Sequence, residues 1–115
     1  MGSAVSNQID GLLRTVRIHR PDRRNAVDGP TANALREAFE RVGRDERLRA
    51  VVLTGAGERA FVGGADLNEL GGCCADSGRL YITRLHKACK AIRDCPAPVI
   101  ARINGFCLGA GLEIA

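Results

Sequence analysis

The feature that most constrains the fold of this chain is a pattern that occurs twice along it. In each copy an apolar strand is followed by a turn of small residues and the start of a helix, once over residues 60–70 and again over 99–115. Small residues and the first turn of a helix both leave backbone N–H groups unpaired. If the two strands are neighbours in a sheet, two of these groups can converge on one carbonyl oxygen. The pattern therefore indicates the outline of an oxyanion hole.

Two other interpretations of the turns remain open from spacing alone. The first is that the glycines only permit tight turns and close packing of helices. The second is phosphate binding, which fits poorly because no GK[ST] sequence follows a glycine loop. The run Gly109-Ala110-Gly111 also lacks the third glycine of a dinucleotide-binding fingerprint.

Each turn carries one acid. Glu113 comes directly after the second turn and is a candidate for moving a proton, a role that requires enough burial to raise the pKa of its carboxyl. An acid in the first turn of a helix is also stabilised by the helix dipole alone, by about 0.3–1 kcal/mol. Asp66 has the same structural explanation, as the cap of a short helix that extends to Leu70.

The rest of the chain predicts alternating strands and helices, and so an α/β fold. Residues 12–19 alternate with a period of two, and 50–55 form a continuous apolar run typical of a strand buried on both faces. One amphipathic helix is expected between an N-cap at Asp28 and Gly43, and a strand is expected over 98–103. Between them a longer helix is predicted, with a stripe formed by Ile82, Leu85, Cys89 and Ile92.

The sequence predicts a single domain. Residues 10–115 are expected to form one domain, and residues 1–9, which are small and polar, to be a disordered or cloning-derived N-terminus. With 45% apolar residues and few aromatic ones, the core is expected to consist of aliphatic side chains.

Arginine accounts for most of the net charge of +4. The positive charge is compatible with a ligand that carries phosphate groups, although for any single arginine a solvated surface is the simpler explanation. Nucleic acid is a poor candidate partner, because no aromatic residues interleave the arginines.

The five cysteines form an odd set without CxxC spacing and without histidines placed as zinc ligands. We therefore expect no metal, reduced thiols and a cytoplasmic location. The sequence has no apolar run long enough to span a bilayer and no secretory signal pattern.

Several motifs in this order resemble the N-terminal half of the enoyl-CoA hydratase/isomerase (crotonase) superfamily. The resemblance covers roughly residues 10–115, and its two glycine-containing motifs are more specific together than either is alone. The motifs are Arg24-Asn25-Ala26, Val51-Val52-Leu53-Thr54-Gly55, Arg59-Ala60-Phe61-Val62-Gly63-Gly64-Ala65-Asp66-Leu67, Pro98-Val99-Ile100-Ala101, Asn104-Gly105 and Gly109-Ala110-Gly111-Leu112-Glu113.

The resemblance implies a ββα-spiral subunit that binds an acyl-CoA. Its thioester oxygen would be held by the backbone amides of Ala65 and Ala110, and Glu113 would match one of the family's two acid/base glutamates. The family commonly has glycine at the position of Ala110, and many members have lysine at that of Asn68, where a phosphate contact is then in doubt. The segments that would hold coenzyme A contribute Arg24, Ala26, Gly63, Gly64, Ala65, Asp66 and Leu67.

By the same resemblance, the spiral is truncated before completion, and a second glutamate would lie beyond residue 115. The parent protein would be a hydratase or isomerase without a separate cofactor, because coenzyme A is part of its substrate, and it would form a homo-oligomer, a trimer or a hexamer. For the chain alone, a catalytically inert fragment that binds acyl-CoA or partner subunits stays an alternative.

Overall fold

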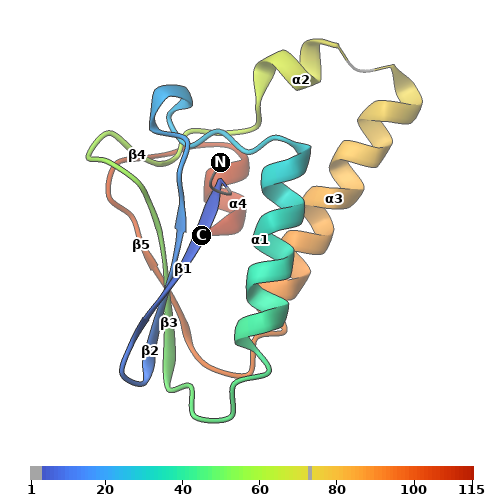
Figure 1. Ribbon diagram of the computed structural model, residues 1–115. Coiled ribbons are helices and arrows are strands. Elements are labelled where there is room, and N and C mark those ends of the chain that lie inside the picture. Colours follow the sequence, from blue (N-terminus) through green and yellow to red (C-terminus); the bar gives the residue numbers. More distant parts are fainter. Residues whose placement is uncertain (1–3, 73) are drawn as a thin grey trace.

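Two long helices lie together beside a four-stranded sheet in the computed structural model of the chain, which describes residues 4–72 and 74–115 (Figure 1). A second sheet of two strands and a short C-terminal helix lie at one end of this layer. The elements are β1 (Val5–Asp10), β2 (Leu13–Ile18), the 3-10 helix η1 (Pro21–Arg23), α1 (Gly29–Val42), β3 (Ala50–Gly55), β4 (Ala60–Val62), α2 (Leu67–Gly71), α3 (Ala75–Arg93), β5 (Val99–Arg102), β6 (Phe106–Cys107) and α4 (Ala110–Ile114).

The larger sheet has the strand order β1-β2-β3-β5. Strand β1 runs antiparallel to β2, whereas β2, β3 and β5 are mutually parallel. A helix connects each parallel pair, because parallel strands need a long crossover. The predicted α/β class and the strand–helix–strand order are therefore found.

The hydrophobic core lies between this sheet and α1. Side chains that alternate along β2 and β3, such as Val16 and Leu53, are buried against Leu35 and Phe39 of α1. Helix α1 begins where predicted, because the Asp28 carboxylate accepts a hydrogen bond from the N–H of Thr31, at 2.9 Å. The buried residues of α1 recur along the helix from Gly29 to Val42, and the helix packs against both the sheet and α3.

The N-terminal segment differs from our expectation of disorder over residues 1–9. Residues Val5–Asp10 form strand β1 and pair with β2 over six residues. This strand has little apolar pattern, with Val5 as its one buried hydrophobic side chain, and backbone pairing across the turn at Gly11 holds it. Residues 1–3 lie outside the described part of the chain.

Two predicted burial patterns are also corrected. Strand β3 is buried at Val51 and Leu53 on one face, whereas on its other face Val52 is half-buried and Thr54 is buried, so the expected burial on both faces holds only at the C-terminal end of the strand. In α3 the side chain of Ile82 is 44% exposed and that of Tyr81 is 1% exposed. Tyr81 is buried because its hydroxyl donates a hydrogen bond to the carbonyl oxygen of Val27, a polar contact that an apolar stripe does not reveal.

Candidate active site

The structure brings the two small-residue turns side by side. Strand β4 pairs in parallel with β6, and the N–H of Leu108 donates to the carbonyl oxygen of Val62 at 3.3 Å. The partner of β4 is therefore β6 and not the apolar strand over residues 99–102, which lies in the larger sheet as β5. The two turns therefore lie side by side, although through a different strand from the one that the sequence indicated.

Glycine at position 111 permits this close approach. A Cβ atom there would overlap the carbonyl group of Val62, so the backbone of α4 packs directly against the end of β4. Gly109, which precedes the helix, has φ +52° and ψ −117°, a conformation that residues with a side chain rarely adopt. Both glycines are thus required by the path of the chain between β6 and α4.

The amides of Ala65 and Ala110 are unpaired in the part of the chain that the structure describes, since neither N–H has a protein acceptor there. Around Ala65, Val27 accepts from the N–H of Asp66 at 3.1 Å and donates to the carbonyl oxygen of Gly64 at 3.0 Å. These bonds engage the groups on both sides of Ala65. Its own N–H is directed away from Val27, as alternation along a strand requires.

A surface cavity of about 450 Å³ lies next to the first turn. Its lining includes every residue that the family resemblance assigned to coenzyme A binding, together with Arg23 and Asn68. The assigned residues in its wall are Arg24, Ala26, Gly63, Gly64, Ala65, Asp66 and Leu67. Ala110 and Glu113 do not line this cavity, although the carbonyl oxygen of Leu108 lies close to Gly64.

The loop that forms one wall of the cavity has an unusual backbone. Arg24 and Asn25 have φ values of +53° and +56°, in the left-handed region that Asn adopts more readily than most residues. The Arg24 guanidinium lies over the ring of Phe106, 5.8 Å from its centroid, and so links the loop to β6. A single cation–π contact of this kind contributes about 0.5–1 kcal/mol at an exposed site.

Asn25 is fully buried and fixes the loop. Its Oδ1 accepts from the N–H of Arg20 at 2.8 Å, and its Nδ2 donates to the carbonyl oxygens of Ala56 and Ala60 at 3.0 and 2.9 Å. Sequence reasoning included Asn25 in a motif without giving it a role. The preference of asparagine for the left-handed region was the available signal.

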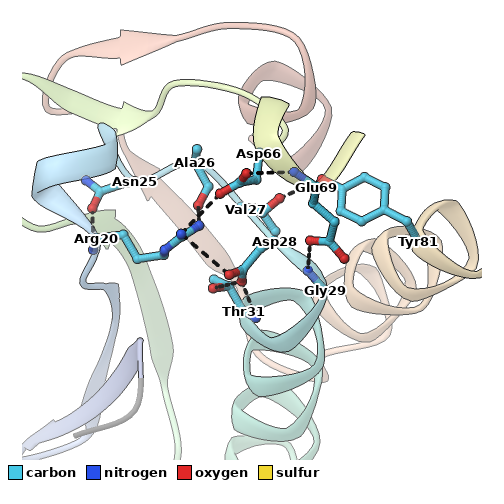
Figure 2. A network of polar contacts seen from close by, with 10 residues as sticks. All are labelled: Arg20, Asn25, Ala26, Val27, Asp28, Gly29, Thr31, Asp66, Glu69 and Tyr81. Carbon is cyan, nitrogen blue, oxygen red and sulfur yellow. Dashed lines mark hydrogen bonds and ion pairs between the residues drawn. The ribbon is translucent and has the colours of Figure 1, made fainter. Parts of the chain in front are cut away.

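Asp66 is the centre of a polar network (Figure 2). It is 7% exposed, and one carboxylate oxygen accepts from the N–H of Glu69, which caps α2 as predicted. The other oxygen accepts from the guanidinium of Arg20 at 3.1 Å. The Glu69 N–H, followed by Arg20, holds the pKa of Asp66 below its ordinary value, against the opposing effect of burial.

The stability contributed by Asp66 is therefore expected to depend on pH. A carboxyl whose pKa is lower in the folded than in the unfolded state stabilises the fold at pH values above the unfolded pKa. This contribution is lost as the pH falls through the folded pKa. We expect Asp66→Asn to lower the free energy of unfolding by about 1.5–3 kcal/mol near neutral pH. The difference between variant and wild type should shrink in acid, below the ordinary aspartate range. Urea denaturation across this range measures it, and a constant difference would contradict the ionic role.

Glu113 lacks the burial that is expected of a residue that moves a proton. Its side chain is exposed in the described part of the chain. It lies near α3, where burial of the Cys89 thiol and then the negative charge of Glu113 raise the pKa of Cys89. The exposure of Glu113 fits the alternative interpretation of this acid as a partner of the helix dipole in the first turn of α4, and its role in proton transfer stays a prediction.

Cys74, Cys89, Cys95 and Cys107 are free thiols, and Cys73 lies outside the described part. Among residues 4–72 and 74–115, no group of three or more His, Cys, Asp or Glu side chains could hold a metal ion. None of the helices in that part has the length and apolar character needed to cross a bilayer.

Comparison with known proteins identifies close relatives of this arrangement. A sequence model described as enoyl-CoA hydratase/isomerase matches residues 9–115. The chain is 40% identical to a probable enoyl-CoA hydratase of Mycobacterium tuberculosis over 107 residues, which are 93% of this chain and 41% of that protein. It is 34% identical to the mitochondrial Delta(3,5)-Delta(2,4)-dienoyl-CoA isomerase of Rattus norvegicus, covering 86% of this chain and 33% of the isomerase.

Solved structures agree with these sequence matches. A crystal structure of an enoyl-CoA hydratase/carnithine racemase from Magnetospirillum magneticum superposes with a TM-score of 0.94 at 39% identity, over 100% of this chain and 44% of that one. The enoyl-CoA hydratase of Bacillus anthracis gives a TM-score of 0.92 at 29% identity, over 96% of this chain and 43% of that one. The chain therefore spans less than half the length of the relatives that it matches.

Proposed function

Since the chain belongs to the enoyl-CoA hydratase/isomerase family, with its crotonase-like α/β fold, we propose that it provides the thioester-binding part of an acyl-CoA enzyme. The substrate class is a 2-enoyl-CoA or a related unsaturated acyl-CoA, and the reaction is hydration or double-bond isomerisation. No separate cofactor is needed, because coenzyme A is part of the substrate. The supporting observation is that two unpaired amides, on Ala65 and Ala110, lie on adjacent turns, the first of which lines a cavity with Arg23 and Arg24 in its wall.

The proposed mechanism follows from where charge develops. Addition of water to the double bond, or movement of that bond, passes through a thioester enolate whose oxygen becomes negative. Two amide donors fixed by the backbone stabilise this oxygen without reorganising during the reaction. Glu113 would transfer a proton to or from water or the acyl chain, and bound substrate would shield its carboxyl from solvent.

The cavity would hold part of coenzyme A. Arg23 and Arg24 place positive charge at its wall, which suits phosphate groups, and Gly63 and Gly64 leave backbone accessible to the pantetheine chain. Asn68 supplies a neutral amide at the rim, so its contribution to phosphate binding would be a hydrogen bond and not an ion pair. We further propose a homo-oligomeric assembly, a trimer or a hexamer, for the whole protein.

One observation favours a second candidate function. Glu113 is exposed, and it is the one acid assigned to proton transfer among the described residues. A domain that binds acyl-CoA without turnover would need the cavity and the amides but not a buried acid. In that case the chain would act as an acyl-CoA-binding or interaction module.

Turnover and binding measured in parallel separate the two functions. The protein would be titrated with saturated butyryl-CoA by calorimetry and assayed with crotonyl-CoA by loss of the enoyl absorbance. Enzymatic function predicts binding together with turnover, and binding alone would favour the module. Coenzyme A titrated separately reports how much affinity comes from the nucleotide, and absence of binding to either ligand would contradict both functions.

A further inference from the structure

Arg20 joins two segments that come from distant parts of the chain. It lies directly before η1, and its side chain is 18% exposed. Its Nη1 donates to the carbonyl oxygen of Ala26 at 2.5 Å, and its Nη2 donates to Asp66 at 3.1 Å (Figure 2). The same Nη2 lies 3.5 Å from a carboxylate oxygen of Asp28. One guanidinium group thus contacts the loop before α1 and the turn before α2.

Both carboxylates that Arg20 contacts are helix caps. Asp28 accepts from the N–H of Thr31 at the start of α1, and Asp66 accepts from the N–H of Glu69 at the start of α2. Each carboxylate uses one oxygen for its helix and presents the other to Arg20. The single cation therefore fixes the starting points of two helices relative to each other.

Ala65 directly precedes Asp66, one of the two aspartates that Arg20 contacts. Its neighbour Asp66 is bound through its side chain to Arg20 and through its N–H to the carbonyl oxygen of Val27. Val27 in turn follows Ala26, whose carbonyl oxygen also accepts from Arg20. Val27 also bonds to the residues on both sides of Ala65, the carbonyl oxygen of Gly64 and the N–H of Asp66. The backbone on both sides of the Ala65 N–H is therefore held by Val27, and Arg20 holds Ala26 and Asp66, the residues next to Val27 and Ala65.

We propose that Arg20 is a positioning residue that aims the Ala65 amide at the substrate oxygen, an inference that rests on the proposed function. Arg20 does not line the cavity next to the first turn and acts through Asp66 and Ala26. Transition-state stabilisation by an amide depends steeply on its placement, and a displacement of about 1 Å can cost about 100-fold in rate. Loss of Arg20 would leave the donor present but free to shift.

The planar guanidinium is suited to this task. It presents donors in fixed directions, so one group can bind a carbonyl oxygen and two carboxylates at once. A lysine ammonium carries the same charge without the fixed fork, and it cannot reproduce these directions. Arg20→Lys therefore tests geometry separately from charge.

The kinetic experiment compares Arg20→Met and Arg20→Lys with a matched control, Arg36→Met. Arg36 also pairs with a carboxylate, Glu40 at 3.2 Å, but on the exposed side of α1. For both Arg20 variants we expect kcat with crotonyl-CoA to fall by up to about 100-fold. The dissociation constant of butyryl-CoA should stay within about twofold, because the amide counts most when the oxygen is charged. Methylguanidinium should restore part of the kcat of Arg20→Met.

A purely structural role of Arg20 would give a different result. If kcat and butyryl-CoA affinity fell together in both variants, in proportion to the loss of melting temperature, or if kcat were unchanged, positioning would be overturned. The Arg36→Met control should retain wild-type kcat, and a loss equal to that of Arg20→Met would also contradict the proposal.

Hydrogen exchange distinguishes failure of this inference from failure of the proposed function. In Arg20→Met the amides of Val27 and Asp66 should exchange faster than in wild type, while amides of β2 and β3 keep their protection. This readout needs no turnover. An inactive wild-type protein would contradict the enzymatic function, and unchanged exchange at Val27 and Asp66 would overturn the positioning role in either case.

Discussion

Replacing Ala110 by proline is expected to lower kcat by about 100- to 1000-fold, the usual effect of removing one oxyanion-hole donor. Proline lacks the N–H, and Ala110 is the first residue of α4, a position where proline is accepted without loss of a helical hydrogen bond. The substitution therefore removes the donor and leaves the helix intact. Initial rates with crotonyl-CoA measure the effect, and circular dichroism verifies the fold.

The matched control for this variant is Ala110→Gly. Glycine keeps the amide N–H and removes the buried methyl group, so its rate should remain far closer to wild type than that of the proline variant. Equal losses in the two variants would assign the effect to packing at α4 and would remove the Ala110 amide from the mechanism.

Replacing Glu113 by glutamine is expected to lower kcat by about 100- to 10,000-fold, the range typical of a lost general acid or base. Glutamine has nearly the same shape but cannot transfer a proton. The affinity for butyryl-CoA should change little, since no proton moves in binding. Initial rates with crotonyl-CoA measure kcat, and calorimetry with butyryl-CoA measures the affinity.

Glu37→Gln is a suitable control for the Glu113 variant. Glu37 is an exposed glutamate on α1, so its neutralisation changes the net charge equally without affecting the site. A wild-type rate in Glu113→Gln would remove Glu113 from the mechanism. That outcome, together with retained binding, would favour the acyl-CoA-binding module.

The fold was largely predictable because most of its elements carry local signals. Helix α1 has its cap at Asp28 and an apolar stripe, and β3 is an apolar run. Strand β1 was missed because pairing with β2 stabilises it and its sequence has no apolar alternation. The pairing of β4 with β6 was missed for a similar reason, since a strand of two residues is defined by its partner and not by its own sequence.

The candidate site was also predictable from the sequence only in part. Residues 63–67 and 109–113 were identified because glycines and an acid stand at recognisable spacings, and the structure gathers the residues assigned to coenzyme A around one cavity. Arg20 and Tyr81 were not found, because each acts through contacts with residues far along the chain. Neither exposure of Glu113 nor burial of Asp66 can be obtained from residue identity alone.

The contact between Gly111 and the carbonyl group of Val62 has a consequence for how this site can vary. The spacing of the two turns is set there by main-chain atoms, so it does not depend on the size of any side chain. Side chains nearby can change with little effect on the distance between the turns, whereas one added methyl group at position 111 forces them apart. The distance between the two turns is therefore a property of the backbone, and Gly111 is a residue on which it directly depends.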